Sequence, residues 1–284
     1  MQVAEKLGNR RTTGTEQFYT PRDLASLLVQ AALPHIANPS QSRFLEPAAG
    51  NGSFVAALKA AGAKSIVAID RYPAAPGITE ANFLETELSE ANLITFTNPP
   101  FGRNNALSIP FFNHAAKFSS TICFLVPRSW RKWSVTNRLD PSFHLVYDQD
   151  VFVSYEDAAG EPITEKNGLR TCFQIWQKRD HVREKVVVPD NGLIQKASPA
   201  SADVAIRVFG YGCGTVLTDF PRKPNTTLMF LRVSPRARGL LPKLEYSKFS
   251  ENTAYTQALA FTEINYLLNE AVYGNPFHEE KAEH

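Results

Sequence analysis

Continuous apolar runs alternate with helix-forming segments through the first half of the chain, and this alternation restricts the folds that the chain can adopt. The strand-like runs cover residues 43–45, 65–69, 93–97 and 121–126. Apolar residues at helical spacing follow Thr20-Pro21, which predicts a helix capped by Thr20, and further helices are expected over 53–61 and 110–118. Buried strands that alternate with helices are typical of a parallel sheet covered on both faces. We therefore expect a doubly wound, Rossmann-like α/β domain.

The pattern changes after about residue 145, where the strand-like runs become shorter and Gly, Pro and Asn separate them. These runs cover residues 145–147, 151–153, 173–176, 186–188, 204–208 and 227–233, and a helix is expected over 253–273. The pattern predicts a small C-terminal extension that is rich in β-strands and partly helical. A chain of 284 residues is long enough for two parts. We place them at 1–180, with 1–40 as an N-terminal segment, and at 181–284.

Composition narrows the classes of protein that this chain can belong to. The 43% hydrophobic and 20% charged residues are ordinary for a globular protein, and 30 Lys and Arg nearly balance 28 Asp and Glu. Three widely separated cysteines argue against a disulfide framework, and neither these nor the six scattered His residues have metal-ligand spacing. Because there is no apolar run long enough to span a bilayer and no leader-like N-terminus, we expect a cytoplasmic protein without a bound metal.

A loop of small residues follows the first expected strand and leads into a helix. It reads Glu46-Pro47-Ala48-Ala49-Gly50-Asn51-Gly52-Ser53-Phe54. Glycines let backbone amides approach a ligand closely at the positive end of a helix, and Asp70 follows Gly50 by 20 residues, a spacing suited to an acid that holds ribose hydroxyls. A nucleoside cofactor is therefore favoured over a plain glycine turn. The full dinucleotide pattern is absent and Glu46 would repel a pyrophosphate, which disfavours NAD.

A second group of residues, Asn98-Pro99-Pro100-Phe101, follows the apolar run 93–97. It is therefore expected at the carboxyl end of a parallel strand, where open α/β sheets bind ligands. Prolines have no backbone donor and force the preceding residue to be extended, so this segment offers carbonyl and amide oxygens as acceptors beside the Phe101 ring. Such a site fits a planar group that bears an NH₂. The alternative interpretation is a rigid turn with a structural Asn.

Together these residues resemble the class I methyltransferases that use S-adenosylmethionine (SAM), and specifically those that methylate N6 of adenine in DNA. The order of the motifs resembles the γ group of these enzymes, and the resemblance covers residues 15–180. It implies that Asn98, Pro99, Pro100 and Phe101 are catalytic. It also implies a SAM-binding set. Within this set, Asn82 stands where the family usually has Asp, and Tyr19-Thr20 belong to a segment that closes over the methionine end of the cofactor. This set is Tyr19, Thr20, Glu46, Ala48, Gly50, Asn51, Gly52, Asp70, Asn82, Phe83 and Asn98.

Nucleic-acid contact is expected from a basic stretch that follows the strand run 121–126. Residues 127–138 contain no acid, and the candidates within them are Arg128, Trp130, Arg131, Lys132 and Trp133. A solvated face and core packing of the two Trp residues are the alternatives. A second acid-free stretch covers 220–238, and Gly210-Tyr211-Gly212-Cys213-Gly214 is interpreted as a hairpin or bulge.

The resemblance favours DNA over RNA as the substrate, with the target adenine flipped out of a duplex or already single-stranded. Two alternatives stay open. One is an RNA adenine methyltransferase, and the other is an inactive methyltransferase fold that binds nucleic acid or a partner. Because the extension is small, we expect a short recognition sequence or a partner subunit for target recognition. Restriction-modification, phage self-protection and housekeeping DNA methylation are all compatible with the sequence.

Overall fold

The computed structural model describes residues 18–157, 160–163 and 168–280. The chain forms two compact units, and each is described separately. The first unit comprises residues 1–127 and 134–184, and the second comprises residues 128–133 and 185–284. The boundary therefore lies at 184 rather than at the expected 180, and the short stretch 128–133 packs with the C-terminal part of the chain. Sequence order alone could not show this, because the stretch lies between two segments of the first unit.

The first unit is built on a seven-stranded sheet with the order β3-β2-β1-β4-β5-β7-β6. Neighbours from β3 to β5 run parallel, whereas β7 is antiparallel to both β5 and β6. The strands are β1 (Arg43–Glu46), β2 (Ser65–Asp70), β3 (Thr79–Glu80), β4 (Leu93–Thr97), β5 (Ser119–Pro127), β6 (Phe143–Val151) and β7 (Thr171–Lys178). The strand order reverses between β1 and β4, so the expected doubly wound α/β fold is confirmed. The two runs expected at 145–147 and 151–153 belong largely to the single strand β6.

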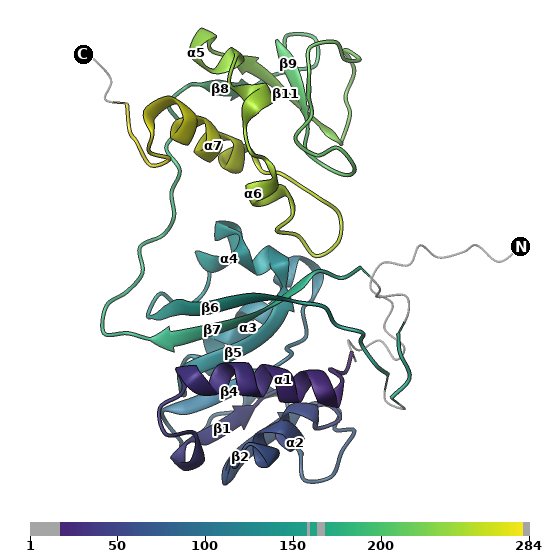
Figure 1. Cartoon of the computed structure of the whole chain (residues 1–284), viewed down its shortest axis with the longest axis vertical. Helices are drawn as coiled ribbons and strands as arrows, with labels where there is room; N and C mark the ends of the chain where they lie inside the picture. Colours follow the sequence, from purple (N-terminus) through teal and green to yellow (C-terminus); the bar gives the residue numbers. More distant parts are fainter. Residues whose placement is uncertain (1–17, 158–159, 164–167, 281–284) are drawn as a thin grey trace, which may run out of the picture. The chain divides into compact units, whose positions relative to one another are not determined.

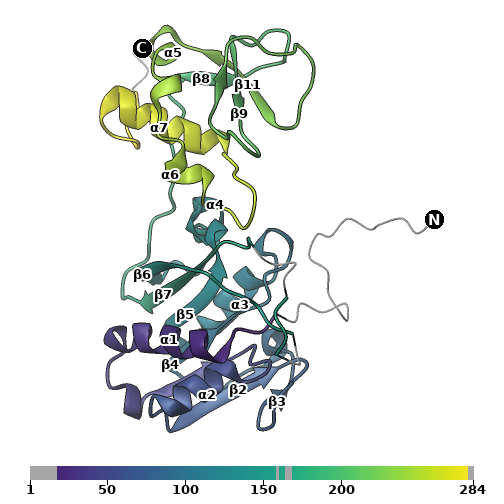
Figure 2. The same ribbon diagram turned by 45° about the vertical axis from the view of Figure 1, so that its right-hand side comes forward.

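Helices cover both faces of this sheet, as Figures 1 and 2 show. Residues of α1 (Arg22–Ala32) and α2 (Ser53–Ala60) share one buried cluster with Cys123 and Leu125 of β5. The intervening Phe124 points to the opposite face, where its ring meets Phe112 of α3 (Ser108–Ala115) edge-on at 5.6 Å. Because side chains alternate along a strand, a strand that is apolar throughout must be buried on both sides. This explains the continuous apolar runs of the sequence.

Helix α1 begins at Arg22, and its cap differs from the one that the sequence suggests. Pro21 is the N-cap residue with extended backbone, and its carbonyl accepts the Ala25 amide at 2.9 Å. Thr20 does not cap the helix, since its Oγ1 atom is buried and has no hydrogen-bond partner among the described residues. The prediction of a Thr20 cap is therefore wrong. Thr20 instead lines the pocket of the candidate site described below.

The second unit has its own four-stranded sheet, in the order β10-β9-β11-β8, and all the pairings are antiparallel. Its strands are β8 (Ile194–Lys196), β9 (Val204–Arg207), β10 (Val216–Leu217) and β11 (Leu228–Val233), and its helices include α5 (Pro235–Arg238), α6 (Ser247–Ser250) and α7 (Phe261–Tyr273). The short helix α4 (Trp133–Thr136) begins at the last residue of the stretch 128–133. One face of the sheet packs on α7 around Ile206, Leu231 and Leu268.

Two local expectations for the second unit are wrong, and one is confirmed. The helix expected over 253–273 begins only at Phe261, because Ala260 is extended and its amide donates to the Glu263 carboxylate at 2.8 Å. The run 186–188 is not a strand. The glycine-rich segment joins the antiparallel strands β9 and β10, so the hairpin interpretation is confirmed.

Candidate active site

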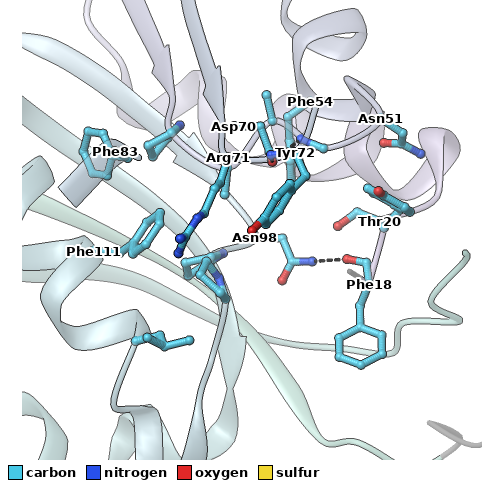
Figure 3. Close-up of a pocket in the computed structure, with 18 of the residues that line it drawn as sticks. Phe18, Thr20, Asn51, Phe54, Asp70, Arg71, Tyr72, Phe83, Asn98 and Phe111 are labelled. Atoms are coloured by element: carbon cyan, nitrogen blue, oxygen red, sulfur yellow. Dashed lines mark hydrogen bonds between the residues drawn. The ribbon is translucent and has the colours of Figure 1, made fainter. Parts of the chain in front are cut away.

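A pocket of about 380 Å³ opens where the carboxyl ends of β1, β2 and β4 meet. These strands are adjacent and parallel, so the segments that follow Glu46, Asp70 and Thr97 emerge at one edge of the sheet. Most of the residues expected at the site line this pocket, and Figure 3 shows several of them. Those that line it are Tyr19, Thr20, Ala48, Gly50, Asn51, Asp70, Asn82, Phe83, Asn98, Pro99, Pro100 and Phe101. Glu46 and Gly52 lie outside this lining.

The loop after β1 is held in a shape that requires glycine. Gly50 and Gly52 have φ values of 48° and 78°, in the left-handed region, and Gly52 is the N-cap residue of α2. A Cβ atom on Gly50 would lie 2.6 Å from the ring of Tyr19, so the aromatic side chain packs directly on the loop backbone. The loop and the segment around Tyr19 therefore form two touching walls of the pocket.

Asp70 binds this loop through its carboxylate. Its Oδ2 atom accepts the Gly50 amide at 2.7 Å, and its Oδ1 atom accepts the Tyr72 amide at 2.7 Å. Each carboxylate oxygen has two lone pairs, so Asp70 retains acceptor capacity toward the pocket that it lines. The residue thus fixes the glycine loop and presents negative charge to the pocket.

Glu46 is a buried acid at the end of β1, with 1% of its surface exposed. Its Oε1 atom accepts the Ala48 amide at 3.2 Å, whereas its Oε2 atom is buried without a hydrogen-bond partner among the described residues. Burial raises the pKa of Glu46 to about 8, because desolvation penalises the charged form. A buried carboxyl with an unsatisfied oxygen favours a cationic or hydrogen-bond-donating group nearby.

The amide of Asn98 has a fixed orientation. Its Nδ2 atom donates to the Phe18 carbonyl at 3.0 Å, which is drawn as a dashed line in Figure 3. The Oδ1 atom is buried and has no hydrogen-bond partner among the residues that the structure describes. Phe18 is itself placed by the next residue, Tyr19, which exchanges two backbone hydrogen bonds with Glu156. The N-terminal segment therefore determines that Asn98 presents an acceptor, rather than a donor, at its other end.

Asn82 and Phe83 lie on another wall of the pocket and have structural contacts of their own. The Asn82 Oδ1 atom accepts the Leu84 amide at 3.3 Å and caps the 3₁₀ turn Phe83–Glu85. Phe83 is 1% exposed, and its ring centroid lies 5.4 Å from that of Phe111 on α3. The two rings form an apolar wall, at which an aromatic ligand can pack.

Sequence reasoning did not identify several residues that line the pocket, including Arg71, Tyr72, Leu107 and Phe111. Figure 3 shows Arg71 and Tyr72 beside Asp70, and the Arg71 guanidinium lies 5.7 Å from the Tyr72 ring centroid. Their position directly after the acid of β2 is a sequence feature that could have pointed to them. Phe111 had no such feature, because it is one apolar residue of a helix that packs on the sheet.

The residues expected to contact nucleic acid lie in the second unit, and their placement differs from that of an exposed basic rim. Trp130 is fully buried. The Lys132 Nζ atom pairs with the Glu263 carboxylate at 2.7 Å and 3.0 Å and donates to the Ala258 carbonyl at 3.2 Å. The Trp133 ring stacks on Tyr266 at 5.6 Å. Trp130 and Trp133 thus pack as the core-packing alternative expects, while Arg128, Arg131, Lys132 and Trp133 are partly exposed.

No group of three or more His, Cys, Asp or Glu side chains is arranged to hold a metal ion in the part of the chain that the structure describes. Cys123, Cys172 and Cys213 form no disulfide among these residues. Over the same residues, no helix is long and apolar enough to cross a membrane.

Comparisons with known proteins give similarity at the level of the fold. No protein-family model matches the chain, and no curated protein matches its sequence. PH1948 from Pyrococcus horikoshii, which has been suggested to be an RNA methyltransferase, is 17% identical with a TM-score of 0.47 and covers 61% of this chain and 93% of its own. TrmN from Thermus thermophilus is 17% identical with a TM-score of 0.41 and covers 56% and 49%. The modification subunit of a suggested type I restriction enzyme from Vibrio vulnificus is 15% identical with a TM-score of 0.41 and covers 57% and 44%.

Proposed function

We propose that this chain is a SAM-dependent methyltransferase that transfers a methyl group to the exocyclic N6 amine of adenine in DNA. The observation that carries the proposal is the Asn98 Oδ1 atom at the pocket, which is buried and has no partner among the described residues. Its orientation is fixed by the Phe18 carbonyl, and Pro99 and Pro100 follow it without backbone donors of their own. An NH₂ group on a planar ring satisfies such a set of acceptors.

The pocket residues fit SAM as the cofactor. The volume of the pocket, about 380 Å³, lies within the usual range for small-ligand sites. Thr20, whose Oγ1 atom is buried without a partner among the described residues, lines the pocket, and Asp70 adds a carboxylate. Glu46, the buried acid at the end of β1, directly precedes the loop residues that line it. Acidic and hydroxyl groups of this kind suit a cofactor that carries an ammonium, a sulfonium and ribose hydroxyls. We assign the ribose to Asp70 and the adenine ring to the wall of Asn82 and Phe83.

The residues of the chain contribute positioning and electrostatics to the reaction. When bound, SAM supplies a methyl group on a positively charged sulfur. The amine of adenine is a weak nucleophile because its lone pair is delocalised into the ring. Hydrogen bonds from its N–H groups to Asn98 Oδ1 and to the carbonyl of Pro99 draw electron density to the nitrogen and stabilise the positive charge that develops there. Phe101 stacks on the base and holds it in line with the methyl group.

We assign this chemistry to the first unit, residues 1–127 and 134–184, and target recognition to the second unit. The stretches 128–133 and 185–284 contain 14 Lys and Arg against 10 Asp and Glu, whereas the remainder contains 16 against 18. An excess of basic over acidic residues in the second unit suits contact with phosphates. DNA is the substrate that the motif order favours, RNA adenine is the second candidate, and a partner subunit could extend the recognition surface.

Transfer of tritium from labelled SAM tests this proposal directly. The protein is offered duplex DNA, single-stranded DNA and total RNA in parallel, and the products are digested to nucleosides. Label in N6-methyladenine from DNA is expected. Label in RNA alone would make the DNA assignment wrong. A protein that binds SAM without labelling any polymer would support the alternative of an inactive methyltransferase fold that binds nucleic acid or a partner. Asn82 in place of Asp is the sequence feature that favours this alternative.

A further inference from the structure

Two loops of the second unit lie side by side and together form an exposed aromatic surface. One loop, residues 208–215, joins β9 to β10, and the other, residues 251–260, precedes α7. The Gly210 amide donates to the Gln257 carbonyl at 3.0 Å, and the Leu259 amide donates to the Val208 carbonyl at 2.9 Å. We call these two loops the aromatic loop pair.

Three aromatic side chains of the aromatic loop pair are exposed. Tyr211 is 100% exposed, Phe209 is 50% exposed and Tyr255 is 41% exposed. A fully exposed Tyr ring contributes nothing to the core. Aromatic residues gathered on a surface are more often explained by a ligand or partner than by folding.

The conformation of the loop around Tyr211 is fixed by two glycines and by backbone hydrogen bonds. Gly212 and Gly214 have φ values of 73° and 97°, and a Cβ atom on Gly214 would lie 2.7 Å from Tyr246. The Gly214 amide donates to the Arg207 carbonyl at 2.7 Å, and the Thr215 amide donates to the Gly212 carbonyl at 3.0 Å. The loop is therefore an ordered structure that presents Tyr211 to solvent, and a ring held this way loses little entropy when it stacks on a ligand.

The charge around the aromatic loop pair suits an anionic ligand. Residues 204–218 and 252–262 contain no Asp or Glu. The Arg207 side chain runs beneath the loop, with its Cδ and Nε atoms 3.6 Å and 3.8 Å from the position of a Cβ on Gly212. Glu251, at the start of the second loop, is the one acid within the pair. A cation beside exposed rings is a combination with which proteins hold single-stranded nucleic acid.

The aromatic loop pair is also anchored to another segment of the second unit, the stretch 128–133. The Lys132 ammonium donates to the Ala258 carbonyl, and it pairs with Glu263 in the first turn of α7. Lys132 belongs to the stretch 128–133 of the second unit.

We propose that Phe209, Tyr211 and Tyr255 form a stacking surface for unpaired bases, with Arg207 as the phosphate contact. The ligand class is single-stranded or locally unpaired nucleic acid. The choice of nucleic acid rests on the proposed function, since a methyltransferase acting on a base needs its target out of the stack. The surface favours substrates with unpaired bases over a closed duplex.

Binding measurements without SAM test this proposal separately from catalysis. The probe is a fluorescein-labelled 20-nucleotide single strand of mixed sequence, titrated with the full-length protein and followed by fluorescence anisotropy. Tyr211→Ala should weaken binding about 10-fold, because one base–aromatic stack is lost. Tyr211→Phe should bind like wild type, because the ring is kept. Leu27→Ala removes a side chain that is 66% exposed in the first unit and serves as the matched control.

Three outcomes decide the matter. A Phe209→Ala/Tyr211→Ala double variant that binds the single strand within about twofold of wild type overturns the stacking surface. A Tyr211→Ala variant that loses self-association in sedimentation, with oligonucleotide binding unchanged, also overturns it and points to a protein contact. If single strands bind through Tyr211 but no nucleic acid is ever methylated, the stacking surface stands and the proposed methyltransferase activity fails.

Discussion

Asn98 donates its amide hydrogen to the carbonyl oxygen of Phe18, a residue 80 positions earlier in the chain, at 3.0 Å. This bond decides which end of the Asn98 amide faces the pocket, and it leaves Oδ1 as the acceptor. A side chain that acted only as an acceptor could be replaced by Asp. A side chain that must donate with one end and accept with the other could not.

Asn98→Asp and Asn98→Ala are therefore both expected to lower the rate of methyl transfer by about 100-fold or more. The Asp carboxylate offers acceptors but no donor. Its oxygen and the Phe18 carbonyl oxygen therefore repel each other, and the side chain loses its orientation. Single-turnover transfer of tritium into DNA at saturating SAM gives the rate, and equilibrium dialysis confirms that the cofactor is bound. Full activity in Asn98→Asp would show that the bond to Phe18 has no catalytic role.

Gly50→Ala is expected to damage both stability and cofactor binding. The added Cβ would lie 2.6 Å from the Tyr19 ring, and the φ of 48° is already strained for Ala. Gly62 provides the matched control, because it too has a positive φ, 91°, but nothing lies within 4 Å of its Cβ position. Gly62→Ala should cost about 1 kcal/mol of unfolding free energy and leave SAM affinity unchanged. Urea denaturation and SAM titration of the two variants separate backbone strain from the clash, and equal behaviour in both measurements would exclude a role for the Tyr19 contact.

Glu46 makes stability depend on pH in a definite direction. Burial raises the pKa of its carboxyl to about 8 in the folded protein, above the value near 4.5 in an unfolded chain. Below pH 4.5 both states hold the proton. Between pH 4.5 and 8 the folded state keeps a proton that the unfolded state has released, so the contribution of Glu46 to stability falls as the pH rises.

Glu46→Gln removes this titration and should be more stable than wild type near pH 8, with a difference that shrinks toward pH 5. Thermal unfolding in buffers from pH 5 to 9 measures it, and Glu80→Gln on the exposed strand β3 is the control for loss of an exposed carboxyl. A difference in Tm that is constant with pH would mean that Glu46 is ionised throughout this range in the folded protein. The same variant should bind SAM more weakly, because a neutral amide cannot become an anion beside a cationic cofactor.

Local patterns predicted the elements that hold the candidate site. The apolar runs before Glu46, Asp70 and Asn98 became β1, β2 and β4, and parallel pairing then brought those residues to one edge of the sheet. Periodicity could predict this because burial on both faces leaves a continuous apolar run. The orientation of Asn98 was not predictable, since it depends on a backbone oxygen 80 residues away.

The basic stretch after β5 shows where one-dimensional patterns fail. Four cations without an acid between 127 and 138 predict an exposed basic stretch that contacts nucleic acid. The partner of Lys132 is Glu263, however, which is 131 residues further along the chain. Local charge patterns do not show such long-range pairing, and the same folding buries Trp130.

The Lys132–Glu263 pair yields the last prediction. The two side chains are only 15% and 2% exposed, so they form an ion pair that is largely shielded from water. Removing one partner leaves a buried charge without compensation, which costs about 3–5 kcal/mol. Lys132→Met should therefore destabilise the protein strongly, because it leaves the Glu263 carboxylate buried. Replacing both partners by neutral side chains removes that penalty.

The double variant Lys132→Met/Glu263→Gln should recover a large part of the loss, since Gln can still accept the Ala260 amide that Glu263 accepts at 2.8 Å. Urea denaturation of the wild type, both single variants and the double variant gives the coupling free energy of the pair. Lys248→Met/Glu270→Gln is the matched control, because that pair is 38% and 42% exposed and should show coupling below about 1 kcal/mol. Additive effects at Lys132 and Glu263 would mean that the buried contact contributes no more than an exposed one, and that the stretch 128–133 is held to the second unit by its Trp side chains instead.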